Sequence, residues 1–198
     1  MTSIREQPTQ LLPALFRHVD EDQRLQVLHL GPACQDTLDF FSSYRCRLQI
    51  IDLFAELPVP AEEDTQSGLQ DYFRDLLQLN PDTRFDVCLF WDLFNYLPAA
   101  ALQAFMQVLA PHLADTCLGH AFSVHNPRTE ELPLLFGIRD SDCLGVRRRA
   151  APVPGYAPHS QNRLKELLHC FAMERSVLLA DRRLELLLRA RAAEPARH

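Results

Sequence analysis

Three short segments of the chain carry residue types at a spacing that could form a binding site. Gly31 closes an apolar run and lets the chain turn tightly, and the small Ala33 leaves room for a ligand to approach. Asp52 lies 21 positions after Gly31, about the spacing at which an acid in nucleotide-binding α/β folds accepts hydrogen bonds from ribose hydroxyls. Residues 91–96 end another apolar run in polar and aromatic groups. Each feature alone is typical of a turn or a helix cap, but together they favour a nucleotide-type pocket.

Histidines offer a second kind of chemistry. His125 follows an apolar run, where a histidine with a pKa near neutrality can act as a general base; a solvated loop residue is the plainer interpretation. His29, His120 and His159 could gather near it, but neither their spacing nor nearby acids indicate metal ligands. The six cysteines form no C-x-x-C pair, so we expect no metal site.

Apolar runs and helical patterns indicate the elements that must position these residues. Buried strands are predicted at Leu25–Gly31, Leu48–Leu53, Phe85–Trp91, Thr116–Val124, Met173–Leu179 and Arg183–Arg189. Helices are predicted at Leu11–Val19, Asp36–Ser43, Leu69–Leu79, Pro98–Leu113 and Ser160–Phe171. This alternation predicts a three-layer α/β fold with a mostly parallel sheet. The last two strands are joined by a turn too short for a parallel crossover, so they must be antiparallel.

The chain has 198 residues, which is the length of one domain. We expect a helical lead-in over residues 1–24, a single α/β domain over 25–191 and a tail over 192–198. Within the domain, residues 126–158 hold five prolines and no clear period, which is typical of a variable insertion or a lid. An exposed loop is expected over 56–66, where prolines and adjacent acids gather.

In these segments the sequence resembles the class I S-adenosylmethionine-dependent methyltransferases. Gly31, Asp52 and the strand Phe85–Asp92 look like the first, second and fourth motifs of that family, and Ser160–Arg189 resembles its closing helix and antiparallel pair. The resemblance covers roughly residues 25–189. It implies a Rossmann-like methyltransferase sheet that carries the cofactor above its first two strands and the acceptor near the end of the fourth.

The resemblance also implies roles for individual residues. The cofactor S-adenosylmethionine would be bound by His29, Gly31, Ala33, Asp52, Leu53 and Asp92. The methyl acceptor, a small molecule or a protein, would be oriented or deprotonated by Asn95, Tyr96 and His125. An active enzyme of this kind would work mainly by holding the methyl group and the acceptor atom in line.

The first motif departs from the family pattern. Where the family has acid-x-Gly-x-Gly-x-Gly, this chain has His29-x-Gly31-x-Ala33-x-Gln35. The departure motivates a second hypothesis, a non-catalytic domain of the same fold that acts by binding a protein partner. A nicotinamide-dependent oxidoreductase is a third, but Asp36 would then place a like charge near the pyrophosphate, whereas a positively charged sulfonium tolerates nearby acids.

The chain between Asp52 and Phe85 is too short for both a full helix and a full third strand. If Leu69–Leu79 is a helix, the third strand of the family is short or missing. The alternative is a strand at Leu69–Phe73, which would place Asp75 on the adenine side of the pocket.

Charge and thiols limit the partners and the compartment. The formal net charge of −6 argues against a nucleic-acid-binding module. Residues 1–100 hold 7 basic and 16 acidic side chains and residues 101–198 hold 13 and 10, so the second half could face an anionic partner, although a solvated face is the plainer interpretation. No apolar stretch reaches the roughly 18 residues of a membrane span. Unpaired cysteines, with no signal pattern in Met1–Gln10, indicate the cytoplasm.

Overall fold

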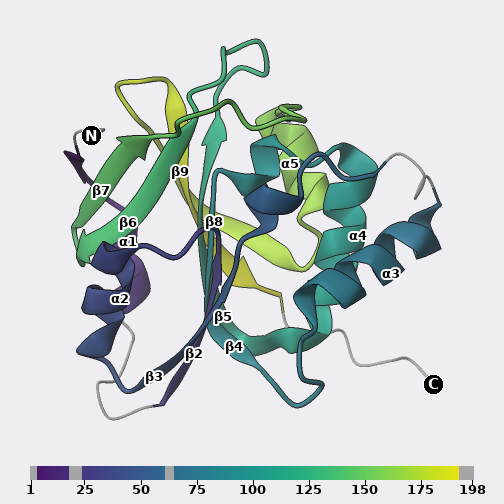
Figure 1. Ribbon diagram of the computed structural model, residues 1–198, viewed down its shortest axis with the longest axis horizontal. Coiled ribbons are helices and arrows are strands. Elements are labelled where there is room, and N and C mark those ends of the chain that lie inside the picture. The colour runs from purple at the N-terminus through teal and green to yellow at the C-terminus, as the bar shows by residue number, and fades with distance from the viewer. Residues whose placement is uncertain (1–3, 18–23, 61–64, 192–198) are drawn as a thin grey trace.

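The computed structural model describes residues 4–17, 24–60 and 65–191. Its centre is a six-stranded sheet in the order β3-β2-β4-β5-β9-β8, which Figure 1 shows nearly edge-on. The strands are β2 (Leu25–Leu30), β3 (Cys46–Ile51), β4 (Phe85–Trp91), β5 (Leu113–Val124), β8 (Phe171–Leu178) and β9 (Arg183–Ala190). The first four pair in parallel, and β9 pairs antiparallel with both β5 and β8. The predicted fold class, a mostly parallel sheet with a closing antiparallel pair, is confirmed.

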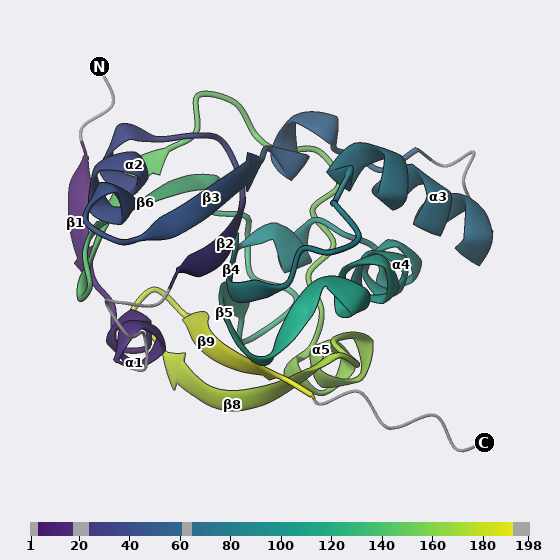
Figure 2. The same ribbon diagram turned by 90° about the horizontal axis from the view of Figure 1, so that it is seen from below.

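Helices cover both faces of this sheet. They are α1 (Leu12–Phe16), α2 (Gln35–Ser42), α3 (Gln66–Leu77), α4 (Ala99–Leu109) and α5 (Gln161–Leu167), with short 3-10 turns at Leu53–Glu56, Leu93–Asn95 and Ala110–His112. Figure 2 shows α3, α4 and α5 on one face and α1 and α2 on the other. In β4, Phe90 packs into the core under α3–α5, whereas Leu89 and Trp91 pack into the core on the α1–α2 side. This division follows from the two-residue period of a strand.

The third strand that the family resemblance implies is missing from the described residues. α3 leads directly into β4, and Thr65 caps its first turn by accepting a hydrogen bond from the Gly68 N–H at 3.1 Å. The predicted helix is therefore confirmed, and the alternative strand at Leu69–Phe73 is wrong. Its pattern is helical because Leu69, Phe73 and Leu77 lie on one buried face.

A second, three-stranded sheet lies over the α1–α2 side of the molecule. It consists of β1 (Arg5–Pro8), β7 (Cys143–Arg148) and β6 (Leu134–Asp140), in that order. β6 and β7 fall within residues 126–158, where the sequence showed no period, and β1 falls within the expected helical lead-in. β6 and β7 were missed because glycines and arginines interrupt their apolar residues. β1 was missed because it is polar, so its pairing with β7 rests on backbone groups rather than on an apolar pattern.

A buried carboxylate fastens the N-terminal segment to the central sheet. Glu185, on β9, accepts hydrogen bonds from the Thr9 hydroxyl, from the Gln10 and Leu11 N–H groups at 3.1 Å each, and from His120 Nε2 at 2.9 Å. Burial by itself would raise the pKa of Glu185, but these donors outweigh it and hold the pKa at about 2. The carboxylate is ionised at neutral pH and holds the chain just before Leu12, where α1 begins.

Several boundaries differ from the prediction where a turn ends an element early. α4 ends at Leu109 rather than Leu113, because a 3-10 turn with Pro111 follows it. α5 ends at Leu167; residues 168–170 of the predicted helix form a turn, and Phe171 starts β8. Residues 18–19 of the first predicted helix, 61–64 of the predicted loop and the tail 192–198 lie outside the described residues.

All six cysteines are free thiols. In the part of the chain that the structure describes, no helix is both long and apolar enough to cross a membrane.

Candidate functional site

The carboxyl ends of β2, β3 and β4 meet at one edge of the sheet. The chain leaves β2 through α2 on one face to reach β3, and returns through α3 on the other face to reach β4 on the far side of β2. Such a reversal of strand order is where open α/β sheets bind ligands. The Gly31 N–H donates to the Ile51 carbonyl at 2.8 Å, so the loops after β2 and β3 are joined at this edge.

Aromatic side chains surround Gly31. A β-carbon at this position would lie 3.4 Å from Trp91 Cδ1, 3.6 Å from His29 Nε2 and 3.7 Å from Phe54 Cε2. Three strand ends therefore contribute a ring to the space beside this glycine. The Phe54 ring also meets the Tyr96 ring edge-on, with centroids 5.7 Å apart.

His29 is a neutral, buried imidazole. Burial lowers its pKa to about 4, although a hydrogen bond from Nε2 to the Pro32 carbonyl, 3.3 Å long, opposes this shift. With the proton on Nε2, the Nδ1 atom is an acceptor, and it has no partner within the described chain. Position 29 therefore offers a hydrogen-bond acceptor but no negative charge.

Asp52 and Leu53 lie where β3 ends. The Asp52 side chain is half-buried, and its Oδ1 atom is buried without a partner among the described residues. Leu53 is buried in the α3–α5 core. A carboxylate oxygen without a partner at a strand end is the kind of acceptor to which ribose hydroxyls donate, whereas Leu53 contributes packing.

Trp91 holds a left-handed backbone, with φ of 53°. A bulky residue adopts this conformation only when its surroundings enforce it, and such strain is common at binding sites. Here the indole lies flat against the Phe136 ring, with centroids 5.5 Å apart and 6° between planes. Its Nε1 donor is buried without a partner in the described structure.

Asp92 follows Trp91 and is 5% exposed. Burial raises its pKa to about 7, although the positive charges of Arg149 and Arg183 oppose the shift. Its Oδ1 atom is a fourth buried atom at this edge that lacks a partner in the described chain. Asp92 can therefore exchange a proton near neutral pH, which suits a general acid or base.

The Asn95 side chain forms hydrogen bonds with other residues of the protein. Its amide nitrogen donates to the Phe122 carbonyl at 3.4 Å, and its amide oxygen accepts from the Ser123 hydroxyl at 3.5 Å. The side chain therefore fastens the end of β4 to β5. Its backbone carbonyl accepts from the Ala157 N–H at 2.8 Å, which adds the segment before α5 to the same contact.

Tyr96 connects the strand end to the segment that follows β5. Its hydroxyl donates to Glu131 Oε1 at 3.0 Å, and the Val153 N–H donates to the same oxygen at 3.3 Å. The Tyr96 and Tyr156 rings meet with centroids 5.5 Å apart. Burial raises the pKa of Tyr96 well above its usual value, so the phenol keeps its proton.

Arg149 closes the site from the β6–β7 side. Its guanidinium carbon lies 4.1 Å from the centre of the Phe54 ring, and its Nε donates to the Leu134 carbonyl at 2.9 Å. A cation over an aromatic face contributes about 0.5–2 kcal/mol, depending on how far it is removed from water. Arg149 thus joins the hairpin to the loop after β3.

Two of the predicted residues lie apart from this group. His125 is exposed at the end of β5, and its backbone N–H donates to the Arg182 carbonyl at 3.3 Å. Ala33 lines a cavity of about 200 Å³ between the start of α2 and the β6–β7 hairpin. The structure brings together His29, Gly31, Asp52, Asp92 and Tyr96.

Sequence reasoning missed three residues of the site. Phe54 was passed over because an aromatic residue after a strand is usually core. Glu131 and Arg149 lie in the segment with no clear period, where only the double acid at 130–131 and the arginine run at 147–149 could have drawn attention. No metal site is formed here: in the residues that the structure describes, no three histidine, cysteine or acidic side chains come close enough to hold an ion.

The architecture is that of an open α/β sheet with a reversal of strand order between β2, β3 and β4. The chain superposes with a TM-score of 0.52 on a proposed type 11 methyltransferase from Sulfolobus solfataricus, at 12% identity and over 94% of each chain. It superposes with a TM-score of 0.51 on the PH0226 protein from Pyrococcus horikoshii, at 11% identity, over 91% of this chain and 88% of that one. The chain thus has the fold of class I S-adenosylmethionine-dependent methyltransferases.

A further structural match has a TM-score below 0.5, and the comparisons by sequence found no match. The match to the pyocyanin biosynthetic protein PhzM has a TM-score of 0.47 at 16% identity and covers 91% of this chain but only 54% of that one. No protein-family model matches the sequence, and no curated protein matches it.

The side chains at this edge can be compared with the groups that S-adenosylmethionine would present to them, which are its ribose hydroxyls and its ammonium group. Asp52 Oδ1 is the free acceptor that the ribose hydroxyls require. At the amino-acid end, His29 Nδ1 can accept a hydrogen bond from the cofactor's ammonium group but gives it no counter-charge. These acceptors fit the hydrogen-bonding groups of the cofactor, and position 29 offers no negative charge to its ammonium group.

Proposed function

We propose that the protein binds S-adenosylmethionine at the carboxyl ends of β2, β3 and β4 and transfers its methyl group to an acceptor. One observation carries the proposal. Of the eight buried side-chain atoms without a partner in the described chain, four belong to residues in or next to the carboxyl ends of these strands, His29, Asp52, Trp91 and Asp92. An unpaired buried polar atom costs about 1–3 kcal/mol, and a ligand that pairs with these atoms recovers that free energy.

The chain's own side chains would each have a defined task. When bound, S-adenosylmethionine supplies an electrophilic methyl group. Asp52 accepts hydrogen bonds from the ribose hydroxyls, and His29 Nδ1 accepts one from the amino group. Asp92, with its pKa of about 7, takes up the proton that the acceptor loses. Asn95 and Tyr96 act as positioning residues, because both are engaged by other parts of the chain.

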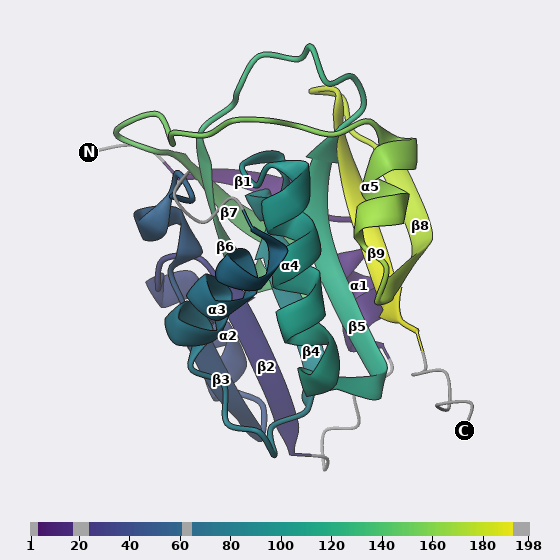
Figure 3. The ribbon, with the colours of Figure 1, turned by 90° about the vertical axis from the view of Figure 1, so that its right-hand side faces the viewer.

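The acceptor would enter over β4 and β5. Figure 3 shows the segment after β5 and the segment after β7 passing over the end of the sheet where the parallel strands stop. Glu131, Arg149 and Tyr156 come from these segments and reach the site through Tyr96 and Phe54. Their shape and charge would select the acceptor, in line with the expectation that residues 126–158 form a lid.

Thermal unfolding with matched ligands tests the proposal. A ligand at about 100 times its dissociation constant stabilises the folded state by about 2.7 kcal/mol. S-adenosylmethionine and S-adenosylhomocysteine should both raise the Tm, and NAD should leave it unchanged. Equal protection by NAD, or no protection by either sulfur compound, would contradict the proposal.

A non-catalytic role is the second candidate, and a specific observation favours it. The Asn95 amide and the Tyr96 hydroxyl are both used in contacts within the protein, and position 29 lacks the family's acid. This candidate predicts that neither S-adenosylmethionine nor S-adenosylhomocysteine protects the protein in the same unfolding experiment.

A further inference from the structure

A second cavity, of about 410 Å³, lies between β1, the end of β7 and the start of β9. Its wall holds four arginines, one aspartate, one glutamine and three apolar residues. The charged residues give the lining a net charge of +3, four positive against one negative, in a chain whose formal net charge is −6. Overall composition therefore does not explain this concentration of positive charge.

Arg183 fixes one of these charges inside the protein. Its side chain is 7% exposed, and its guanidinium carbon lies 4.9 Å from the centre of the Phe122 ring. Nη2 donates to Asp181 Oδ2 and to Gln7 Oε1, each at 2.6 Å, and Nε donates to Asp181 Oδ2 at 2.9 Å. Nη1 has no partner in the described structure, and neither does the Gln7 Nε2 donor beside it. Two buried donors at this cavity are thus left without an acceptor.

Arg5 and Arg148 supply charge at the exposed rim. Neither side chain forms an ion pair within the described residues, whereas Arg147 is partly engaged by Asp36 Oδ2 at 3.2 Å. Burial would raise the pKa of Asp181, but its hydrogen bonds with Arg183, together with the charges of Arg183 and Arg5, hold it below its usual value. Asp181 therefore stays ionised, and it offsets only one of the four positive charges.

We propose that this cavity binds a small organic anion, with its carboxylate or phosphate group between Arg183, Gln7 and the rim arginines. The guanidinium group donates hydrogen bonds in a fixed planar fork that suits both kinds of anion. The apolar body of the ligand would lie against Leu134 and Val146, which line the same cavity. This site stands on its own residues and does not depend on cofactor binding.

Calorimetric titration with benzoate, phenyl phosphate, inorganic phosphate and benzyl alcohol tests the proposal at low ionic strength. The two aromatic anions should bind with a dissociation constant below about 1 mM, which corresponds to about −4 kcal/mol. Comparing benzoate with phenyl phosphate identifies the preferred anion. Inorganic phosphate should bind more weakly because it lacks the apolar part, and benzyl alcohol should not bind because it lacks the charge.

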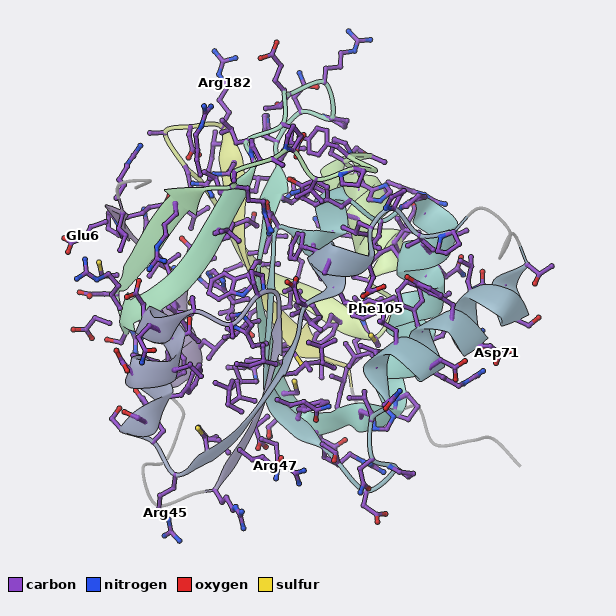
Figure 4. All side chains as sticks on the ribbon, in the orientation of Figure 1. Glu6, Arg45, Arg47, Asp71, Phe105 and Arg182 are labelled. Carbon is purple, nitrogen blue, oxygen red and sulfur yellow. The ribbon has the colours of Figure 1, made fainter. Side chains whose placement is uncertain are left out.

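A matched pair of charge reversals provides the control. Arg5→Glu with Arg148→Glu should weaken binding at least about tenfold, since a hydrogen bond to a charged group contributes about 1.5–3 kcal/mol. Arg45→Glu with Arg47→Glu makes the same change of net charge at the other end of the molecule. Figure 4 shows Arg45 and Arg47 at the end opposite Arg182, which precedes Arg183 in the turn beside the cavity. All four positions are exposed, so both variants are expected to fold.

Two results would overturn the proposal. One is that neither aromatic anion shows saturable binding at concentrations up to about 10 mM, because a dissociation constant above this value means a binding free energy weaker than about −3 kcal/mol. The other is equal weakening in the two double variants, because that would make binding a property of the overall charge rather than of this cavity.

Discussion

Asp92 is a buried acid whose surroundings disfavour its ionised form. A carboxyl group 5% exposed, with one oxygen unpartnered in the described chain, is costly to ionise. Burial raises its pKa to about 7, and the charges of Arg149 and Arg183 reduce this cost without removing it. A group kept in this state at the expense of stability, at the end of a strand beside a strained Trp91, is typical of a functional site.

Replacing Asp92 by Asn should stabilise the protein at pH 8 by about 2–4 kcal/mol. The folded-state pKa of about 7 lies above the ordinary value of 3.8, so ionisation lowers the free energy of unfolding progressively as the pH rises from about 4 to about 7. Asn mimics the protonated form, and its effect should be small near pH 4. Denaturant unfolding of both proteins at pH 4 and pH 8 measures this difference. An equal change in stability at the two pH values would show that Asp92 ionises without cost.

Asp92 should also make cofactor affinity depend on pH. A sulfonium is a cation, so its binding favours the ionised carboxylate, whereas S-adenosylhomocysteine carries a neutral sulfur. The affinity for S-adenosylmethionine, relative to that for S-adenosylhomocysteine, should therefore rise severalfold between pH 6 and pH 8. Calorimetry at both pH values, with Asp92→Asn as the control that loses the difference, checks this. If the ratio of the two affinities does not change with pH, Asp92 does not lie near the sulfur of the bound cofactor.

The placement of residues at strand ends could be predicted from the sequence, whereas their roles in a binding site stay predictions. Gly31, Asp52 and Asp92 could be found because each directly follows an apolar run. Glu131 and Arg149 could not, because their positions in the site depend on how two irregular segments fold back over the sheet. His125 has the right chemical type but lies exposed at the end of β5, and its catalytic role stays a prediction.

At the scale of elements, the N-terminal segment is held by one buried side chain. Glu185 pairs with His120 and with the backbone ahead of α1, while β1 extends the β6–β7 hairpin. These contacts bring the segment beside the cavity that Arg5 and Gln7 line. The sequence predicted the helix here but not the strand, because β1 has no apolar period.

Glu185→Gln should destabilise the protein by about 3 kcal/mol at neutral pH. Since the folded-state pKa of about 2 lies below the ordinary 4.5, the ionised form contributes stability that is fully present above pH 4.5 and is lost as the pH falls towards 2. Amide exchange at Leu11 should quicken in the variant. Glu174→Gln is the control, because its pair with Arg189 is exposed on both sides and should contribute less than about 1 kcal/mol. Similar losses in the two variants would contradict the assigned role of Glu185.

Phe136 should be the main anchor of the β6–β7 hairpin. Its ring stacks on both Trp91 and Phe122, at centroid distances of 5.5 and 4.8 Å. Phe136→Ala should cost about 3–5 kcal/mol, as for other buried aromatic residues, while the half-buried Leu135→Ala should cost less. Denaturant unfolding compares the two, and a Phe136→Ala loss no larger than that of Leu135→Ala would refute this role.

At the scale of the whole molecule, the layered α/β fold could be predicted because buried parallel strands appear as short continuous apolar runs. Phe85–Trp91 was predicted to the residue, and the turn at 180–182 fixed the antiparallel pair. The chain length between Asp52 and Phe85 predicted that the third strand would be short or missing if Leu69–Leu79 formed a helix, and the structure shows that helix. The second sheet was not predicted, since β1 is polar and pairs with the distant β7, and the β6–β7 hairpin lies in a segment in which no clear apolar period was recognised.

Asp52 is the residue on which the proposed cofactor site depends most. Titration calorimetry with S-adenosylhomocysteine on the wild type, Asp52→Ala and Asp82→Ala tests it most directly, since Asp82 is an exposed acid in the turn after α3. We expect micromolar binding to the wild type and to Asp82→Ala, and a loss of at least about tenfold, or about 1.4 kcal/mol, in Asp52→Ala. Absence of binding to the wild type at millimolar ligand, or unchanged binding to Asp52→Ala, would contradict it.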